Sequence, residues 1–159
     1  MRNLLKGRRV YIDTNIFIYV ALKHPDYYEQ CYRVLDMLVS KEFNGYGSHL
    51  VLFELFGTLS RINVEAAYEA ANSYLNLPLT ILELNRETLD YAREIATLSN
   101  VTYDSLHAAL VAQNNINVVV SEDMNDWGRI LRVWPKIKKR FKTEDLIVIS
   151  PTRGAMRIE

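Results

Sequence analysis

Four acidic residues stand where a charged side chain is costly. Asp13 and Asp123 each close an apolar run that reads as a buried strand, VYID and INVVVSED. Glu54 lies within LVLFELFGTL, and Asp104 begins the Ala- and Leu-rich stretch DSLHAAL. A buried carboxylate must be protonated, paired or bound to a metal, because the desolvation of its charge is expensive. The four positions are therefore candidates for shared chemistry.

Each acid also has a simpler explanation. Asp13, Asp104 and Asp123 could cap the helices that follow them, since Asp is a favoured N-cap residue. Glu54 could reach solvent or pair with an arginine. If the four converge, however, their repulsion would raise their pKa values and destabilise the fold unless a cation neutralised it. Oxygen ligands suit Mg²⁺ or Mn²⁺ better than Zn²⁺, and such clusters carry out metal-assisted phosphodiester chemistry.

The elements that must position these acids alternate between strand and helix. Strands are predicted at residues 9–13, 79–84, 116–123 and 146–150, and the turn-like segment 44–48 has room for a short strand. Helices are predicted at residues 15–22, 27–43, 49–62, 63–77, 85–99 and 102–115, and residues 125–141 are expected to be part helix and part basic loop. Alternating strands and helices favour an α/β fold with a mostly parallel sheet and helices on both faces.

In such a sheet, ligands bind beyond the carboxyl ends of the strands. Asp13 and Asp123 come directly after two predicted strands, so both are expected to face that crevice.

Composition limits the alternatives. The 159 residues are expected to form one domain, residues 1–159, and the formal net charge is zero, so no global field attracts nucleic acid. Cys31 is the only cysteine, which excludes an intrachain disulfide and Cys-rich zinc sites. No segment approaches the roughly 20 apolar residues of a membrane helix, and the start of the chain lacks a signal-peptide core. We therefore expect a cytoplasmic protein without membrane partners.

Four segments together resemble the PIN-domain ribonucleases of the VapC-like kind. They are YIDTNIFIY, ELFGTLSR, YDSLHAALVA and VVVSEDMNDW, in that order, and the resemblance extends from about residue 8 to about residue 152. It implies a three-layer α/β/α sandwich and a metal-dependent endoribonuclease. On that basis Asp13, Glu54, Asp104 and Asp123 would bind Mg²⁺ or Mn²⁺ and carry the catalysis, with water attacking the RNA phosphate in line.

Three further polar residues match positions beside these acids. The resemblance places Asn15 and Ser121 next to the first and fourth acids, where they would orient carboxylates or a metal-bound water. Simple hydrogen bonding within turns is the alternative for both. The fourth segment contains a second acid, Asp126 in MNDW, which could replace or assist Asp123. We favour Asp123 as the fourth acid, since it follows the strand at once, and give Asp126 a supporting role.

A basic segment at residues 129–142, RILRVWPKIKKRFK, surrounds Trp134. Basic residues interleaved with an aromatic suit a phosphate backbone and a stacked base, whereas the alternative is a solvated helix face. The residues expected to contact RNA are Arg132, Lys136, Lys138, Lys139 and Arg140. His107, one helical turn after Asp104, is interpreted as a packed helical histidine rather than a phosphate ligand.

The resemblance also implies partners. VapC-type toxins are usually homodimers that a small antitoxin protein neutralises near the active site. The sequence leaves open whether this protein is a toxin or a housekeeping nuclease, and which RNA it would cleave. The alternative to an enzyme is a non-catalytic PIN-like module that binds RNA or a protein partner.

Overall fold

A six-stranded sheet forms the centre of the computed structural model, which describes residues 1–157. The strand order is β3-β2-β1-β4-β5-β6; the first five strands are parallel, and β6 pairs antiparallel with β5. The strands are β1 (Arg9–Ile12), β2 (Asn44–Ser48), β3 (Leu79–Leu82), β4 (Val118–Val120), β5 (Ile147–Ser150) and β6 (Gly154–Met156). The prediction of a mostly parallel sheet is confirmed.

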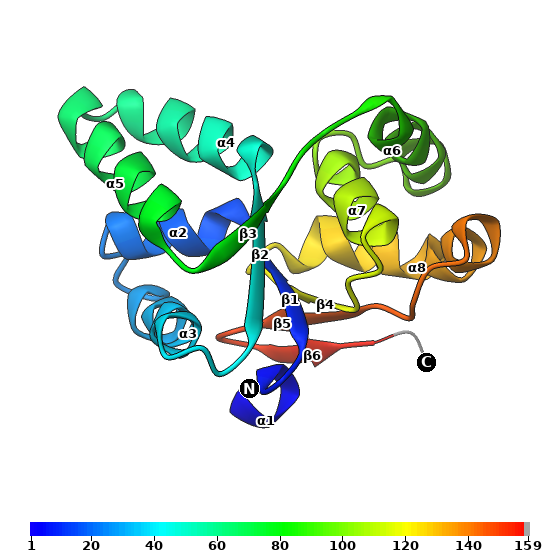
Figure 1. Cartoon of the computed structure of the whole chain (residues 1–159), viewed down its shortest axis with the longest axis horizontal. Helices are drawn as coiled ribbons and strands as arrows, with labels where there is room; N and C mark the ends of the chain where they lie inside the picture. Colours follow the sequence, from blue (N-terminus) through cyan, green and yellow to red (C-terminus); the bar gives the residue numbers. More distant parts are fainter. Residues whose placement is uncertain (158–159) are drawn as a thin grey trace.

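Helices cover both faces of this sheet (Figure 1). One layer contains α2 (Thr14–Ala21), α3 (Tyr28–Val39), α4 (His49–Ser60) and α5 (Val64–Asn76). The other contains α6 (Arg86–Ser99), α7 (Asp104–Gln113) and α8 (Met124–Phe141), while the short α1 (Arg2–Leu5) lies near the amino terminus. The architecture is the predicted α/β/α sandwich. None of the helices within residues 1–157 is long and apolar enough to cross a membrane.

The chain order creates a crevice beside β1. From β1 the chain adds β2 and β3 on one side and then returns to place β4 on the other side. Ligands in open parallel sheets bind at such a reversal of strand order, beyond the carboxyl ends of the strands. Tyr11 pairs with Val119 and Ile12 with Val120, so β1 and β4 end side by side. Asp13 and the segment 121–123 therefore emerge at one point.

Short polar side chains cap three of the helices. The side chain of Ser48 accepts a hydrogen bond from Val51 N at the start of α4. Asn63 accepts one from Ala66 N at the start of α5, and Asn85 forms a reciprocal capping box with Thr88 at the start of α6. These short polar side chains satisfy backbone N–H groups that have no partner within the helix.

The segment 44–48 is a paired strand, so its glycines serve packing more than turning. A Cβ atom on Gly45 would collide with the side chain of Leu38, and one on Gly47 would collide with the hydroxyl of Tyr74. Glycine in a strand often marks such a close approach of neighbouring groups.

The prediction for residues 125–141 was partly wrong, because α8 runs unbroken from Met124 to Phe141 through Pro135. An interior proline costs a helix about 3 kcal/mol. Burial of one large apolar side chain returns roughly 1.5–3 kcal/mol, and Ile130, Trp134 and Ile137 are all fully buried. Packing of this face therefore outweighs the local penalty. The elements α1 and β6 were not predicted, since both are very short.

Candidate active site

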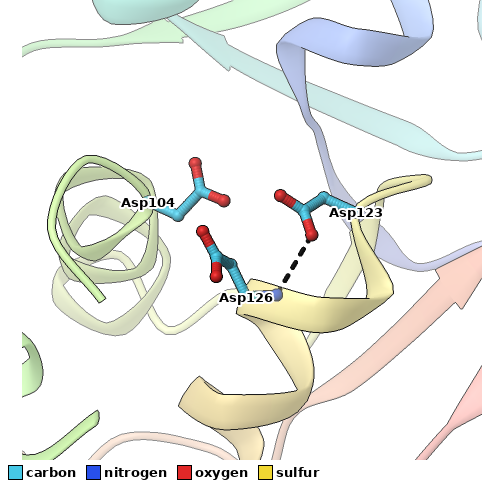
Figure 2. A group of neighbouring side chains, drawn as sticks. All are labelled: Asp104, Asp123 and Asp126. Atoms are coloured by element: carbon cyan, nitrogen blue, oxygen red, sulfur yellow. Dashed lines mark hydrogen bonds between the residues drawn. The ribbon is translucent and has the colours of Figure 1, made fainter. Parts of the chain in front are cut away.

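Three aspartates meet where α7 and α8 begin. Asp104 is the first residue of α7, Asp123 is the N-cap of α8, and Asp126 lies in the first turn of α8. One carboxylate oxygen from each lies within 4.8 Å of the others, and Figure 2 shows the three side chains pointing toward one another. This spacing would allow one cation to contact all three carboxylates.

Asp123 both caps a helix and faces this cluster. Its Oδ1 accepts a hydrogen bond from Asp126 N at 3.0 Å, drawn as the dashed line in Figure 2. The capping explanation and the site explanation are therefore compatible for this residue. For Asp104 the capping explanation is wrong, because Tyr103 occupies the N-cap position of α7 and no side chain caps that helix.

The charge of Asp104 is poorly compensated. The pKa of its carboxyl is raised from 3.8 to about 7; burial is the largest cause, the charge of Asp13 acts in the same direction, and His107 opposes the shift. Asp123 and Asp126 add smaller repulsions. Arg129 approaches Asp126 Oδ1 at 3.5 Å, and among residues 1–157 this is the only ion pair of the three aspartates. The cluster thus holds more negative charge than the chain neutralises.

Asp13 lies at the end of β1 and is held rigidly. Its Oδ1 accepts from Thr14 N at 2.7 Å as the cap of α2. Its Oδ2 accepts from Ser121 Oγ at 2.7 Å and from the indole N–H of Trp127 at 3.0 Å. With 4 % of its surface exposed, the Asp13 carboxylate has a fixed orientation.

Asn15 and Ser121 connect the ends of β1 and β4. The Asn15 amide donates to Asp13 Oδ2 at 3.3 Å and to Ser121 Oγ at 3.0 Å, while its Oδ1 accepts from Glu122 N. Ser121 Oγ also accepts from Asp123 N at 3.0 Å. These bonds orient Asp13 and fix the backbone that leads to Asp123. Asn15 and Ser121 therefore form hydrogen bonds within the turns and also orient the Asp13 carboxylate, so both explanations offered for these residues apply.

Trp127 was not assigned a role from the sequence, although it contacts Asp13 directly. It is fully buried in the first turn of α8 and donates its indole N–H to the carboxylate. The MNDW segment alone could not indicate this bond, since only the packing of α8 beside β1 brings the two residues together.

Glu54 does not join the three aspartates, and the expectation of a largely buried side chain was wrong. Its side chain is 32 % exposed. Of the neighbours that suggested burial, Val51 and Leu55 are buried, but Glu54 lies toward the uncovered face of α4, where Phe53 is 76 % and Phe56 41 % exposed. Glu54 Oε1 instead accepts from His107 Nε2 at 2.5 Å and from Thr14 Oγ1 at 3.3 Å.

His107 is a packed histidine, as interpreted, but it also contacts the acids. Only 1 % of its surface is exposed, and its Nε2 lies 3.9 Å from Asp13 Oδ1 as well as beside Glu54. Burial lowers the pKa of the imidazole, but the hydrogen bond to Glu54 and the charges of Asp13, Glu54 and Asp104 outweigh it and raise the pKa overall. The i, i+3 spacing from Asp104, which places both on one helix face, is the signal that pointed here.

The basic segment lies mostly far from the acids. At 1.5 Å per residue, residues 136–140 stand roughly 15–20 Å along α8 from Asp126, whereas Arg132 stands about 9 Å away. Lys138 pairs with Asp145 at 2.8 Å. The idea that Trp134 stacks on a base was wrong, since it is fully buried and donates its indole N–H to Glu144 O.

Glu122, beside Asp123, has a different environment and was not a candidate. It is 3 % exposed. Its carboxylate accepts from Ser150 Oγ at 2.7 Å and from Thr152 N and Oγ1 at 2.9 and 2.8 Å. These donors lie at the turn between β5 and β6, so Glu122 anchors that turn.

Comparisons with known proteins agree with this architecture. A family model described as PIN domain matches residues 10–130, well over half of the chain. The protein therefore belongs to the PIN-domain family, and its fold is that of the VapC-like members. No curated protein matches the sequence.

Several solved structures share the fold at low sequence identity. VapBC2 from Rickettsia felis, bound to a promoter DNA fragment, matches with a TM-score of 0.65 and 23 % identity over 89 % of this chain and 98 % of that one. Mycobacterium tuberculosis VapC20, described as a sarcin–ricin loop cleaving toxin, matches with a TM-score of 0.63 and 18 % identity over 75 % and 93 %. VapBC-1 from nontypeable Haemophilus influenzae matches with a TM-score of 0.56 and 20 % identity over 77 % and 92 %.

Proposed function

We propose that this protein is a metal-dependent endoribonuclease that hydrolyses RNA phosphodiester bonds. The observation that carries the proposal is the meeting of Asp104, Asp123 and Asp126 beside Asp13 at the reversal of strand order. Membership of the PIN-domain family and the likeness to a toxin that cleaves the sarcin–ricin loop support it.

The donor set fits a hard divalent cation. Carboxylate oxygens are the ligands that Mg²⁺ and Mn²⁺ favour, and the raised pKa of Asp104 reflects burial and repulsion that a cation would offset. We assign Asp104, Asp123 and Asp126 as the principal ligands, with Asp13 and Glu54 beside them. Asp126 thus moves from a supporting role to a direct one. A bound cation would supply charge stabilisation to the phosphate and a water of lowered pKa.

The surrounding residues hold the acids in place for that chemistry. Ser121, Asn15 and Trp127 each donate a hydrogen bond to Asp13 Oδ2, and Thr14 N donates one to Oδ1, so the carboxylate is held at both oxygens. Preorganised carboxylates avoid reorganisation when substrate binds. Arg129 and Arg132 are the basic residues of α8 closest to the acids, and we propose that they guide the RNA backbone more than residues 136–140 do.

We further propose that the protein acts as the toxin of a toxin–antitoxin pair. Two of the similar structures are VapBC complexes. An apolar groove of about 370 Å³ between α2, α3 and α5, lined in part by Val20, Leu35 and Leu77, would accept an apolar segment of an antitoxin. Binding of a purified antitoxin should weaken strongly in Leu35→Glu. RNA cleavage by that variant in the absence of antitoxin should remain.

A second apolar surface suits a homodimer. Phe53 and Tyr103 are 76 % and 82 % exposed, and they border a hollow of about 480 Å³ that also contains Glu54 and Leu106. Exposed apolar patches of this kind mark protein interfaces. We propose that a second copy covers this surface, so Phe53→Glu should shift the protein from dimer to monomer in sedimentation.

The test of the proposed activity is cleavage of labelled single-stranded and hairpin RNAs by the purified protein. It is run with Mn²⁺, with Mg²⁺ and with EDTA, beside Asp13→Asn. Metal-dependent cleavage that is lost in the variant supports the proposal. Folded protein that binds these RNAs without cutting them under any condition would favour the non-catalytic binding module. Cleavage that survives EDTA or Asp13→Asn would contradict a catalytic metal site formed by these acids.

A further inference from the structure

We propose that His107 is a positioning residue that holds the Glu54 carboxylate at the edge of the acidic site. The inference depends on the proposed function only in placing a cation at that site. A single imidazole nitrogen, Nε2, lies 2.5 Å from Glu54 Oε1 and 3.9 Å from Asp13 Oδ1. It thus stands between two carboxylates that would otherwise repel each other.

A buried chain of hydrogen bonds fixes the imidazole ring. Ser48 Oγ accepts from Val51 N at 3.1 Å and meets the Tyr11 hydroxyl at 2.9 Å. The same hydroxyl meets His107 Nδ1 at 2.7 Å. Tyr11, Ser48 and His107 are all buried, so water does not compete for these bonds. The ring therefore has one orientation, with Nε2 toward Glu54.

The direction of these bonds places a proton on Nε2. If Ser48 donates to Tyr11 and Tyr11 donates to Nδ1, every hydroxyl proton has an acceptor and Nε2–H points at Glu54. The opposite neutral tautomer would set a nitrogen lone pair against a carboxylate oxygen at 2.5 Å, which is repulsive. An imidazolium also carries the Nε2 proton. The donor role toward Glu54 is therefore the same in either protonation state.

Glu54 needs such a partner because of its location. It projects from α4 with a third of its side chain exposed, and among residues 1–157 the Thr14 hydroxyl, at 3.3 Å, is its only hydrogen-bond donor besides His107. His107 and Thr14 both bind Oε1, which leaves Oε2 without a hydrogen bond among residues 1–157. The bond also joins α4 in one helix layer to α7 in the other. With Oε1 fixed in this way, Oε2 is the atom that the proposal assigns to the acidic site.

A double-mutant cycle on Mn²⁺ affinity, measured by calorimetry without RNA, tests this role. Groups that orient the ligands of a metal typically change its affinity by about 10- to 100-fold. We expect His107→Leu to weaken Mn²⁺ binding by about that factor and His107→Gln, whose amide can still donate, to recover part of it. Since His107 acts through Glu54, His107→Leu combined with Glu54→Gln should bind no more weakly than Glu54→Gln alone.

The matched control is Thr143→Val. Thr143 is buried and donates to Ala112 O at the opposite end of α7, so its loss reports only on general stability. Tyr11→Phe, which removes the donor to Nδ1, should weaken Mn²⁺ binding severalfold, whereas Thr143→Val should not change it. Wild-type affinity in His107→Leu, or additive losses in the double variant, would overturn the proposal while leaving the ribonuclease intact.

Nuclear magnetic resonance of the imidazole nitrogens gives a readout that needs no metal. The proposal predicts a protonated Nε2 whose proton resonance lies far downfield and moves upfield in Glu54→Gln. If wild-type protein bound no Mn²⁺, the proposed function would fail, and this signal would still decide the role of His107. An Nε2 without a proton, or a resonance unchanged in Glu54→Gln, would overturn it.

Discussion

Glu122 and Asp123 are adjacent in the sequence, yet their carboxylates lie in opposite environments. Glu122 is buried among three hydrogen-bond donors from Ser150 and Thr152. Asp123 turns to the other side, toward Asp104 and Asp126, where like charges meet (Figure 2). A buried charge that is fully hydrogen-bonded serves the fold, whereas a cluster of like charges costs stability and persists where a ligand offsets it.

The largest expected effect separates the two regions by activity. Asp104→Asn should reduce RNA cleavage by about 10³-fold or more, as the loss of a central catalytic group does in other enzymes. Glu122→Gln should leave most of the activity, because among residues 1–157 the Glu122 carboxylate is hydrogen-bonded only to the β5–β6 turn. Initial cleavage rates with Mn²⁺ give the comparison. Equal losses in both folded variants would mean that the two regions are not distinct.

The stabilisation gained on adding Mn²⁺ should also distinguish the cluster around Asp104 from the region around Glu122. At a free Mn²⁺ concentration 100 times its Kd, binding to the native state adds about 2.7 kcal/mol to the free energy of unfolding. Wild type and Glu122→Gln should both gain this stabilisation in thermal unfolding, and Asp104→Asn should gain little. Stabilisation of Asp104→Asn to the wild-type extent would place the cation elsewhere.

Without metal, the free energy of unfolding should be lowered by the change at Glu122 and not by the change at Asp104. Hydrogen bonds to a charged group contribute roughly 1.5–3 kcal/mol each, and Glu122→Gln keeps the shape while it removes the charge. We expect a loss of about 1–3 kcal/mol in urea unfolding for that variant. Asp104→Asn, which relieves repulsion, should not be destabilised. A stable Glu122→Gln would show that the turn does not depend on this carboxylate.

The smallest effect is a pH dependence that originates from Asp104. The folded protein keeps this carboxyl protonated up to a pKa of about 7, whereas the unfolded chain releases the proton near 3.8. The contribution of Asp104 to stability therefore falls as pH rises from about 4 to about 7. In metal-free urea unfolding, the advantage of Asp104→Asn over wild type should grow between pH 5 and pH 8. A constant or shrinking difference would contradict the raised pKa.

The positions of the strand-end acids could be predicted because they follow from topology. Apolar runs ending at Asp13 and Asp123 indicate parallel strands, and such strands end at one edge of a sheet. Helix caps such as Ser48 and Asn63 can also be recognised from sequence, because a cap and the backbone N–H that it bonds lie within four residues of each other.

What could not be predicted depends on how elements pack. The exposure of Glu54 reflects an uncovered face of α4. Neither the bond between His107 and Glu54 nor the bond from Trp127 to Asp13 has a local signal in the sequence. The passage of α8 through Pro135 depends on burial of one helix face against the rest of the molecule. The roles of Glu122 and Asp123 could not be separated in the sequence, since the direction of each side chain is decided by the turn between them.

The position of the cation can be seen directly in a crystal structure with bound Mn²⁺, located by its anomalous scattering. We expect an ion in contact with the carboxylates of Asp104, Asp123 and Asp126, and none at Glu122. An ion coordinated by Glu122, or a site among the three aspartates that stays empty at saturating Mn²⁺, would contradict this assignment.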